Sequence, residues 1–182
     1  FSNAGVASGG DILDTEIDLW NTQWQVNLMA HVYAVRAVLP AMLRRGEGYL
    51  LHTASMAGIL TTHGNVPYAV TKHGVVGLAE WPSITYHDKG IRTSLLAPLG
   101  VNTPMLTGGD SSFANSSAAG PVKEAEEVAE MVVNAVKKEQ FLILTDEIAQ
   151  TWMDRKSGDL ERWLGGMRRL QGKIESAREQ GI

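Results

Sequence analysis

Three polar residues, Ser55, Tyr68 and Lys72, have the types and the spacing to carry out proton-transfer chemistry on a shared ligand. Tyr68 and Lys72 stand four positions apart in "VPYAVTKHGVVGLAE", residues 66–80, and side chains at this spacing lie on one face of a helix. Ser55 ends "GYLLHTAS", residues 48–55, an apolar run with a polar exit that predicts a strand buried on both faces. Because ligands bind beyond the carboxyl ends of strands in open parallel sheets, the three side chains are predicted to meet at one site.

The chemistry that suits this set is proton exchange with an alcohol or carbonyl oxygen. The pKa of a free tyrosine, about 10, is too high for ready use as a base near neutral pH, and a nearby ammonium lowers it because it favours the phenolate. Lowering the pKa of the phenol to near neutral would take roughly 4 kcal/mol of differential stabilisation of the phenolate. A serine hydroxyl can fix and polarise the substrate oxygen. Taken singly, the residues have plainer interpretations, since a Tyr-x-x-x-Lys pair occurs by chance and a strand-end serine is often a turn or cap residue.

The composition is that of a globular chain and excludes several functions. With 182 residues, 44% of them hydrophobic, the chain can bury one sizeable core, so one domain is expected. A formal net charge of −4 and a pI near 5.7 argue against a general nucleic-acid binder. The sequence has no cysteine, which excludes disulfides and thiolate chemistry. Its five histidines lack metal-ligand spacing, so no metal site is predicted, and without an apolar run of about 18 residues no membrane segment is expected in the visible chain.

Hydrophobic periodicity predicts strands and helices in alternation. A long helix is predicted over residues 15–45, with Pro40 kinking or tightening its last turns. A second helix is predicted from residue 66 to about residue 88, where Pro82 favours either a kink or a division at Trp81. The remaining elements are a strand over 91–98, a Gly-, Ser- and Ala-rich loop over 107–120, a helix over 122–138, a strand over 141–145 and an amphipathic helix over 148–178. This alternation implies βαβ units and a parallel sheet.

Five segments, in order and with suitable gaps, together resemble the short-chain dehydrogenase/reductase family. They are "SNAGV", "WQVNLMAHVYAVRAVLPAML", "LHTASMAG", "VPYAVTKHGVVGLAE" and "LAPLGVNTPM". The resemblance is close over about residues 1–145 and looser over the last helix. It implies an α/β fold with a Rossmann-like doubly wound parallel sheet, a nicotinamide cofactor and exchange between an alcohol and a ketone.

The resemblance also implies a role for each matching residue. Tyr68 is the acid/base, Ser55 orients the substrate, and Lys72 lowers the pKa of the tyrosine while holding the nicotinamide ribose. Asn27 sits at a helix irregularity and anchors a water that links Lys72 to solvent, although a mid-helix asparagine bonded to backbone is the plainer interpretation. The implied cofactor-binding residues, besides Tyr68 and Lys72, are Asn3, Ala4, Gly5, Pro98, Val101 and Thr103. The plainer interpretation of Thr103 is a loop hydroxyl before a proline.

The sequence departs from the family at its front. The glycine-rich TGxxxGxG turn and the residue that distinguishes NAD from NADP are not found, and the chain opens at Phe1. The expectation is therefore an N-terminally truncated, single partial domain over residues 1–182 that lacks the first βαβ units and keeps the catalytic half. Pro98 is followed by Leu99 where the family commonly has glycine, which would alter the backbone facing the nicotinamide.

These features predict an NAD(P)-dependent oxidoreductase that interconverts a secondary alcohol and a ketone, with NAD or NADP left open. The alternative is an inactive fragment or a dimerising interaction protein, and the visible chain alone is expected to be inactive. A serine hydrolase is a weak third hypothesis because no GxSxG elbow surrounds Ser55. The expected partners are a small-molecule alcohol or ketone and further copies in a homodimer or homotetramer, with no nucleic acid, in the cytoplasm.

The substrate itself is not readable from the sequence. Residues predicted to border the pocket indicate an apolar ligand, although apolar residues are equally expected there as packing: Met56, Ala57, Leu60, Met105 and Leu106. The loop over residues 107–120 is predicted to close over the substrate as a lid.

Overall fold

The computed structural model describes residues 1–108 and 120–179. The chain divides into two compact units, Phe1–Asp146 and Glu147–Ile182, which are described separately below.

Within the described residues, the first unit is built on a three-stranded parallel sheet in the order β1-β2-β5. The strands are β1 (Gly48–Thr53), β2 (Ile91–Ala97) and β5 (Leu142–Leu144). Parallel pairing confirms the predicted α/β class, with β1 and β2 ending slightly before the predicted residues. On the other side of β1, Ser2 bridges to His52 in parallel, so the first residues of the chain run beside β1 as a short stretch of neighbouring strand.

The long predicted helix is present as three successive helical segments. These are α1 (Ile17–Gln23), the π-helical η1 (Trp24–Met29) and α2 (Ala30–Arg45), which contains Pro40. Gly46 then ends α2 in the left-handed conformation, with φ of 70°. The π-helical segment lies where Asn27 was expected to mark an irregularity, and π-bulges of this kind are frequent at functional sites.

The helix that carries Tyr68 and Lys72 is α4 (Val66–Thr85). It begins at Asn65, whose side chain accepts a hydrogen bond from the Tyr68 amide at 3.0 Å. The alternative of a division at Trp81 is wrong, because α4 continues through Pro82, and the predicted end near residue 88 is also wrong. The chain leaves α4 at Thr85 and forms the short 3-10 helix η2 (His87–Lys89).

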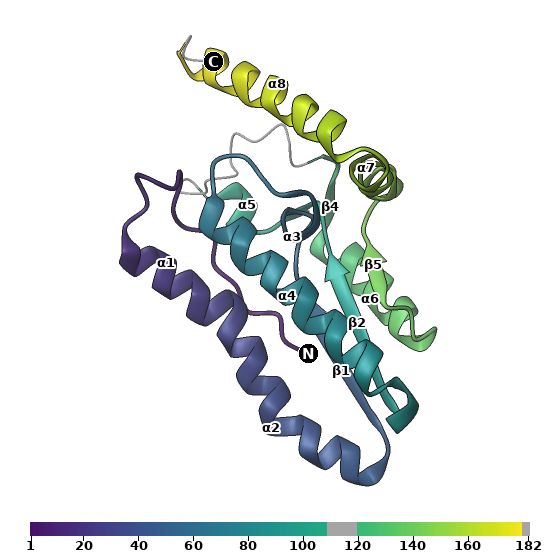
Figure 1. Cartoon of the computed structure of the whole chain (residues 1–182). Helices are drawn as coiled ribbons and strands as arrows, with labels where there is room; N and C mark the ends of the chain where they lie inside the picture. Colours follow the sequence, from purple (N-terminus) through teal and green to yellow (C-terminus); the bar gives the residue numbers. More distant parts are fainter. Residues whose placement is uncertain (109–119, 180–182) are drawn as a thin grey trace. The chain divides into compact units, whose positions relative to one another are not determined.

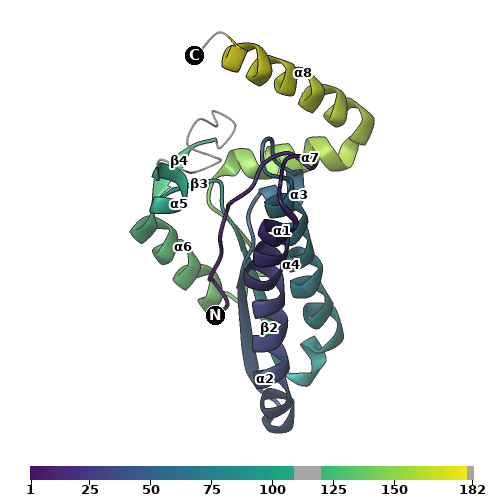
Figure 2. The ribbon, with the colours of Figure 1, turned by 90° about the vertical axis from the view of Figure 1, so that its left-hand side faces the viewer.

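Helices cover both faces of the sheet in this unit. Figures 1 and 2 show α2 and α4 on one side of β1 and β2, and α6 (Ala125–Lys137) on the other. Neighbouring residues of β2 point to opposite faces. Leu95 accordingly packs with Val75 and Ala79 of α4, while Leu96 packs with Val128 and Val132 of α6.

A second, two-stranded parallel sheet corrects one predicted helix boundary. Residues 122–124 were predicted to begin a helix, but they form β4 (Val122–Glu124), which pairs with β3 (Gly100–Asn102). The Asn102 side-chain amide donates to both oxygens of the Glu124 carboxylate at 3.0 Å, which holds this pairing in place. Between them, α5 (Pro104–Thr107) follows β3, and residues 109–119 of the predicted lid lie outside the described residues.

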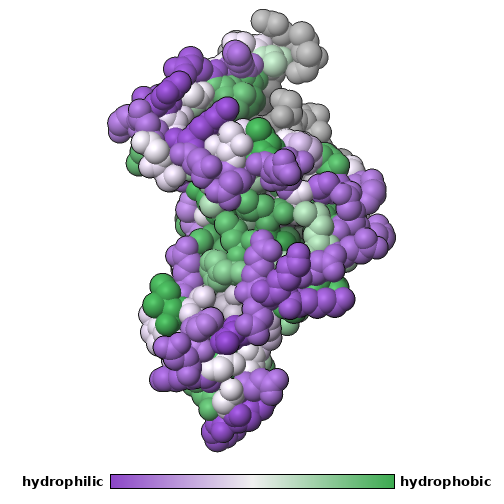
Figure 3. All heavy atoms as spheres, turned by 90° about the vertical axis from the view of Figure 1, so that its right-hand side faces the viewer, coloured by the Kyte–Doolittle hydropathy of each residue, from purple (hydrophilic) through white to green (hydrophobic). Residues whose placement is uncertain are grey.

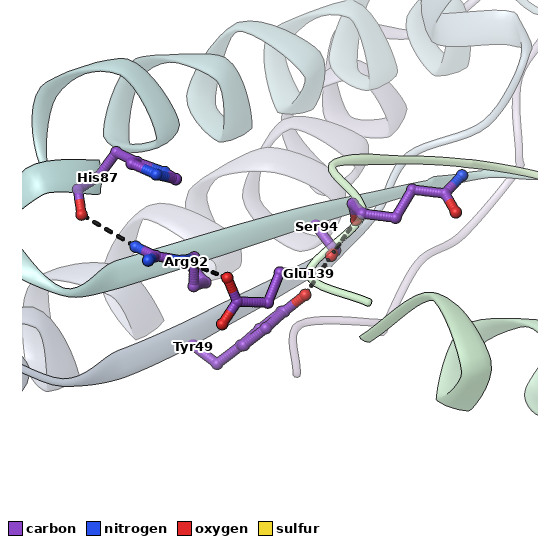
Figure 4. A network of polar contacts seen from close by, with 6 residues as sticks. Tyr49, His87, Arg92, Ser94 and Glu139 are labelled. Carbon is purple, nitrogen blue, oxygen red and sulfur yellow. Dashed lines mark hydrogen bonds and ion pairs between the residues drawn. The ribbon is translucent and has the colours of Figure 1, made fainter. Parts of the chain in front are cut away.

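A polar network ties the middle of the sheet to the segment that enters β5 (Figure 4). The Tyr49 hydroxyl lies 2.7 Å from the Ser94 hydroxyl, which donates to the Gln140 carbonyl at 2.6 Å. Alongside, Arg92 pairs with Glu139 at 2.6 Å and donates to the His87 carbonyl at 2.9 Å. The network joins β2 to both of its neighbours in the sheet and so supports the central position of β2.

The second unit is a pair of helices, which corrects the prediction of one amphipathic helix over 148–178. The two helices are α7 (Glu147–Gly158) and α8 (Leu160–Glu179). The short helix α3 (Ala57–Leu60) belongs to the first unit. The break falls at Asp159, whose carboxylate accepts a hydrogen bond from the Arg162 amide at 2.9 Å and so caps the start of α8.

One helical stretch bears on the expectation that the visible chain has no membrane segment. Ile17–Arg45 is long and apolar enough to cross a membrane by length and composition alone, a test that core helices and signal sequences also pass. Three of its polar side chains, Gln23, Asn27 and His31, are almost completely buried against the rest of the chain. The most apolar 18-residue window of the stretch is 22% buried, however, so burial does not identify it as a core helix.

Candidate active site

Ser55, Tyr68 and Lys72 meet at the carboxyl end of β1. Ser55 follows β1 by two residues, and its hydroxyl accepts a hydrogen bond from the Ala57 amide at 3.1 Å, which fixes the turn into α3. A side-chain hydrogen bond joins Ser55 with Tyr68. Lys72, one helical turn along α4, has its Nζ 5.6 Å from the centre of the Tyr68 ring. The structure therefore brings together the three residues that the spacing predicted to share a site.

Burial dominates the electrostatics of this set. Tyr68 is 7% exposed and Lys72 is 2% exposed. Burial raises the pKa of Tyr68 because it disfavours the phenolate, and the hydrogen bond with Ser55 opposes that rise. Burial also lowers the pKa of Lys72 to about 8, so its amine stays mostly protonated at neutral pH.

The role of Lys72 in lowering the pKa of Tyr68 stays a prediction, because burial is the largest cause of the Tyr68 shift in this chain. The Lys72 ammonium donates to the Thr53 carbonyl at 2.9 Å, which directs its charge toward the end of β1. The net direction of the Tyr68 pKa is upward, and Ser55 is the group that opposes the rise. Phenol, rather than phenolate, is consequently the form of Tyr68 that this environment favours.

Asn27 connects the π-helical segment with the N-terminal loop. Its side-chain oxygen accepts from the Val6 amide at 2.8 Å, and its side-chain nitrogen donates to the Val6 carbonyl at 2.9 Å. The asparagine thus pairs with backbone, as the plainer interpretation held, but with the backbone of a distant segment. Its nitrogen also lies 3.2 Å from the hydroxyl of Thr71, the residue before Lys72 on α4.

Gly5 is the part of the predicted Asn3-Ala4-Gly5 loop that lies beside Asn27 and Lys72. A Cβ placed on Gly5 would lie 3.3 Å from the Asn27 side-chain oxygen and 3.5 Å from Lys72 Nζ. Asn3 lies on the outer side, where its side-chain oxygen accepts from the Thr53 hydroxyl at 2.8 Å, and Ala4 is exposed. A glycine therefore keeps the space beside the lysine free of a side chain.

The other predicted cofactor residues follow β2 at the same edge of the sheet. The Pro98 carbonyl accepts from the Met56 amide at 3.0 Å, which holds the exits of β1 and β2 together. Val101 lies in β3, and Thr103 immediately precedes α5 with its hydroxyl 3.4 Å from the Val101 carbonyl. Leu99, the residue that departs from the family pattern, donates its amide to the Thr145 hydroxyl at 3.1 Å.

The structure favours packing for three of the residues expected to border the pocket. Met56, Ala57 and Leu60 are all buried. Met105 is 38% exposed and Leu106 is half-buried, so these two remain available to a ligand.

Sequence reasoning missed a group of buried polar residues around the site. Gln23, His31, His52, Asn65, Thr71 and Thr145 are each at most 1% exposed. His31 and His52 face each other with their Nδ1 atoms 3.0 Å apart. Asn65 carried a usable signal, an N-cap residue type before a helix, whereas the others have partners far away in the sequence.

Among residues 1–108 and 120–179, no cluster of three or more His, Cys, Asp or Glu could hold a metal ion.

Gly58 of α3 packs directly against the backbone of Lys72. A Cβ at position 58 would lie 2.5 Å from the Lys72 carbonyl oxygen, which cannot yield without moving α4. Gly58→Ala should therefore destabilise the chain by about 1–3 kcal/mol, as overpacking does, and displace Lys72. Urea unfolding of the chain measures the change in the free energy of unfolding.

Gly77 offers a matched control for this substitution. It is an exposed glycine of α4, the helix that carries Lys72, and a Cβ there would meet nothing within 4 Å. Gly77→Ala should stabilise α4 by about 0.5–1 kcal/mol because alanine loses less conformational freedom in a helix. Equal effects of the two substitutions would contradict the packing of α3 on Lys72.

Together, the parallel α/β sheet and the Ser55, Tyr68 and Lys72 cluster at its carboxyl edge define a Rossmann-like class of protein. The family model described as short chain dehydrogenase matches residues 1–112. The chain belongs to this family.

Individual relatives agree with this assignment. The chain is 34% identical over 136 residues to a cyclohexanol dehydrogenase of Acinetobacter sp. (strain SE19), a match that covers 72% of this chain and 53% of that protein. It is 31% identical over 165 residues to a 1-deoxy-11-beta-hydroxypentalenate dehydrogenase of Streptomyces exfoliatus, covering 88% of this chain and 59% of that protein. The chain thus spans about half the length of the curated relatives that it matches.

A solved structure shows the same fold. It is a short chain dehydrogenase/reductase from Burkholderia phymatum in complex with NAD, with a TM-score of 0.76 and 26% sequence identity. The match covers 88% of this chain and 65% of that one. The shared fold confirms the predicted Rossmann-like architecture.

Proposed function

We propose that the complete protein is an NAD(P)-dependent oxidoreductase that interconverts a secondary alcohol and a ketone. The observation that carries this proposal is the hydrogen-bonded Ser55 and Tyr68 pair with the buried Lys72 beside it, at the carboxyl end of a parallel strand. Membership of the short chain dehydrogenase family supports it.

The residues present fit the nicotinamide end of such a cofactor. Lys72 provides a buried ammonium suited to donating hydrogen bonds to ribose hydroxyls, and Gly5 leaves room beside it. The candidate contacts along the exit of β2 are Pro98, Val101 and Thr103, with Asn3 and Ala4 on the N-terminal loop. The bound nicotinamide would supply the hydride acceptor or donor. NAD and NADP are both open, because no residue described here distinguishes them.

In this mechanism Tyr68 moves the proton. In the direction of the ketone, the phenolate takes the hydroxyl proton from the substrate oxygen as the substrate carbon loses its hydride. In the direction of the alcohol, the phenol gives that proton to the oxygen as the carbon gains a hydride. Ser55 donates a hydrogen bond to the same oxygen and holds it in place. The raised pKa of Tyr68 favours the phenol form, the one that protonates a carbonyl oxygen.

We propose a small cyclic alcohol or ketone as the substrate class. One similar protein is a cyclohexanol dehydrogenase. Two apolar side chains follow β3 near the site: Met105, which is 38% exposed, and Leu106, which is half-buried. The test is an absorbance assay for reduced nicotinamide, run on the complete protein with cyclohexanol and NAD or NADP. Turnover with either cofactor supports the proposal. Failure with cyclohexanol and with the open-chain alcohol 2-butanol, together with no binding of NADH or NADPH, would overturn it.

A second function, pairing of copies through exposed helix faces, has its own observation. Large apolar side chains are exposed on α4, including Trp81 at 58% and Ile84 at 83%, and Tyr33 on α2 is 56% exposed. Figure 3 shows apolar and polar residues side by side on one face of the chain. We propose a homodimer or homotetramer, and sedimentation of the 182-residue chain tests it. A stable dimer without affinity for NADH or NADPH would favour the non-catalytic interaction protein. A cytoplasmic location stays a prediction.

A further inference from the structure

A buried glutamine, Gln23, lies at the junction of three segments that build the site. It is the last residue of α1 and is completely buried. Its side-chain nitrogen donates to the Ser8 carbonyl and lies 3.5 Å from the Asn65 side-chain oxygen. Its side-chain oxygen accepts from the Asn27 side-chain nitrogen at 3.1 Å. One amide thus links the N-terminal loop, the π-helical segment and the start of α4.

The surroundings allow only one orientation of this amide. The side-chain nitrogen of Gln23 faces two oxygens, those of Ser8 and Asn65, and its oxygen faces a nitrogen. Turning the amide over would place oxygen against oxygen and nitrogen against nitrogen, which leaves buried donors and acceptors unpaired. The hydrogen-bond network is therefore directional as well as buried.

The partners of Gln23 are the residues that place the catalytic helix. The Asn65 side-chain oxygen that faces Gln23 also accepts from the Tyr68 amide at 3.0 Å. Asn27, on the other side, holds Val6 through two hydrogen bonds and lies next to Gly5 and Thr71. A shift of Gln23 would loosen the loop around Gly5 and the first turn of α4 together.

We propose that Gln23 is a positioning residue of the active site: its buried amide ties Asn27 to the N-cap of the helix that carries Tyr68 and Lys72. This inference rests on the proposed function. Gln23 does not touch substrate, and it acts by fixing the distance between the loop that carries Gly5 and the first turn of α4. Small displacements of catalytic groups are costly, on the order of 10²-fold in rate for about 1 Å.

The test in the complete protein compares three variants. Gln23→Met keeps the length and burial of the side chain but removes the amide, and it should lower kcat by about tenfold to hundredfold with KM little changed. Gln25→Met, at an exposed position two residues along, is the matched control and should leave kcat unchanged. Gln23→Glu loses the donor while its carboxyl is ionised, so its kcat should recover as the pH falls and the protonated carboxyl donates to Ser8 again.

A purely structural role predicts different results. It would lower thermal stability in Gln23→Met without a change in kcat of the folded protein, and Gln23→Glu would show no recovery at acidic pH. Either outcome overturns the proposal.

A second readout does not depend on activity. In the 182-residue chain, Gln23→Met should raise amide hydrogen exchange at Val6 and Tyr68 by about tenfold or more, while Ala79 farther along α4 keeps its protection. Equal acceleration at all three amides would indicate global destabilisation and overturn the proposal. Because this measurement needs no turnover, it separates failure of the Gln23 link from failure of the proposed oxidoreductase.

Discussion

Replacing Tyr68 with phenylalanine should lower kcat of the complete protein by about 10²–10⁴-fold, the range that a lost general acid/base costs. The change removes one oxygen atom from a side chain that is 7% exposed, and the ring keeps its packing. The lost hydroxyl is the group hydrogen-bonded to Ser55 and the only ionisable group of that side chain. Steady-state kinetics with nicotinamide absorbance measure the effect.

The control for this substitution is Tyr33→Phe on α2. Tyr33 is 56% exposed, so removal of its hydroxyl tests for a general effect of losing a phenol. Its kcat should match that of the unaltered protein. Unchanged turnover in Tyr68→Phe would rule out Tyr68 as the acid/base, and equal losses in both variants would show that the effect is not specific to the site.

The cluster of Ser55, Tyr68 and Lys72 could be predicted from sequence because its spacing is local. Tyr68 and Lys72 are neighbours on one helix face, and Ser55 ends the strand that comes before that helix. The hydrophobic pattern also predicted the three strands of the parallel sheet. Short, mostly apolar runs such as residues 91–97 are typical of strands that are buried on both faces.

The elements that sequence reasoning placed wrongly depend on contacts rather than on local pattern. Residues 122–124 continue the helical pattern in sequence but pair with β3, which lies about twenty residues earlier. The last helix was divided by a single capping interaction at Asp159. Short capping and pairing interactions of this type outweigh propensity because each satisfies backbone groups that would otherwise lack a partner.

The polar surroundings of the site could not be predicted for the same reason. Gln23 and Asn65 are 42 positions apart, and His31 and His52 are 21 positions apart. Nothing in the sequence around them indicates these partners. The pKa of Tyr68 likewise depends on its depth of burial and on its hydrogen bond with Ser55, and both are tertiary facts.

The histidine pair predicts that acid weakens the fold well above the pH at which carboxylates lose their charge. Burial, with the neighbouring His52 and Lys72 charges, lowers the pKa of His31 from 6.5 to about 4, and burial lowers that of His52 to about 4. Between these values the unfolded chain binds protons that the folded chain excludes. The stability of the fold is therefore retained above pH 6.5 and falls as the pH drops toward about 4.

The expected size follows from linkage. Each histidine costs up to about 1.4 kcal/mol of unfolding free energy for each pH unit below its unfolded pKa, or about 3 kcal/mol over the whole interval. Protonation of both rings would also place two N–H groups against each other across the 3.0 Å Nδ1 contact. Urea unfolding of the chain at a series of pH values measures the slope.

A pair of histidine variants isolates this contribution from that of the carboxylates. His52→Gln removes one buried titrating group and keeps a side chain that can bond to His31, so its stability should fall less steeply between pH 6.5 and 4. His87→Gln changes an exposed histidine of η2 and should keep the steep dependence, since acid groups elsewhere are the same in both variants. Identical slopes in the two variants would mean that folding does not lower the pKa values of His31 and His52. Water would then reach this pair in the folded chain.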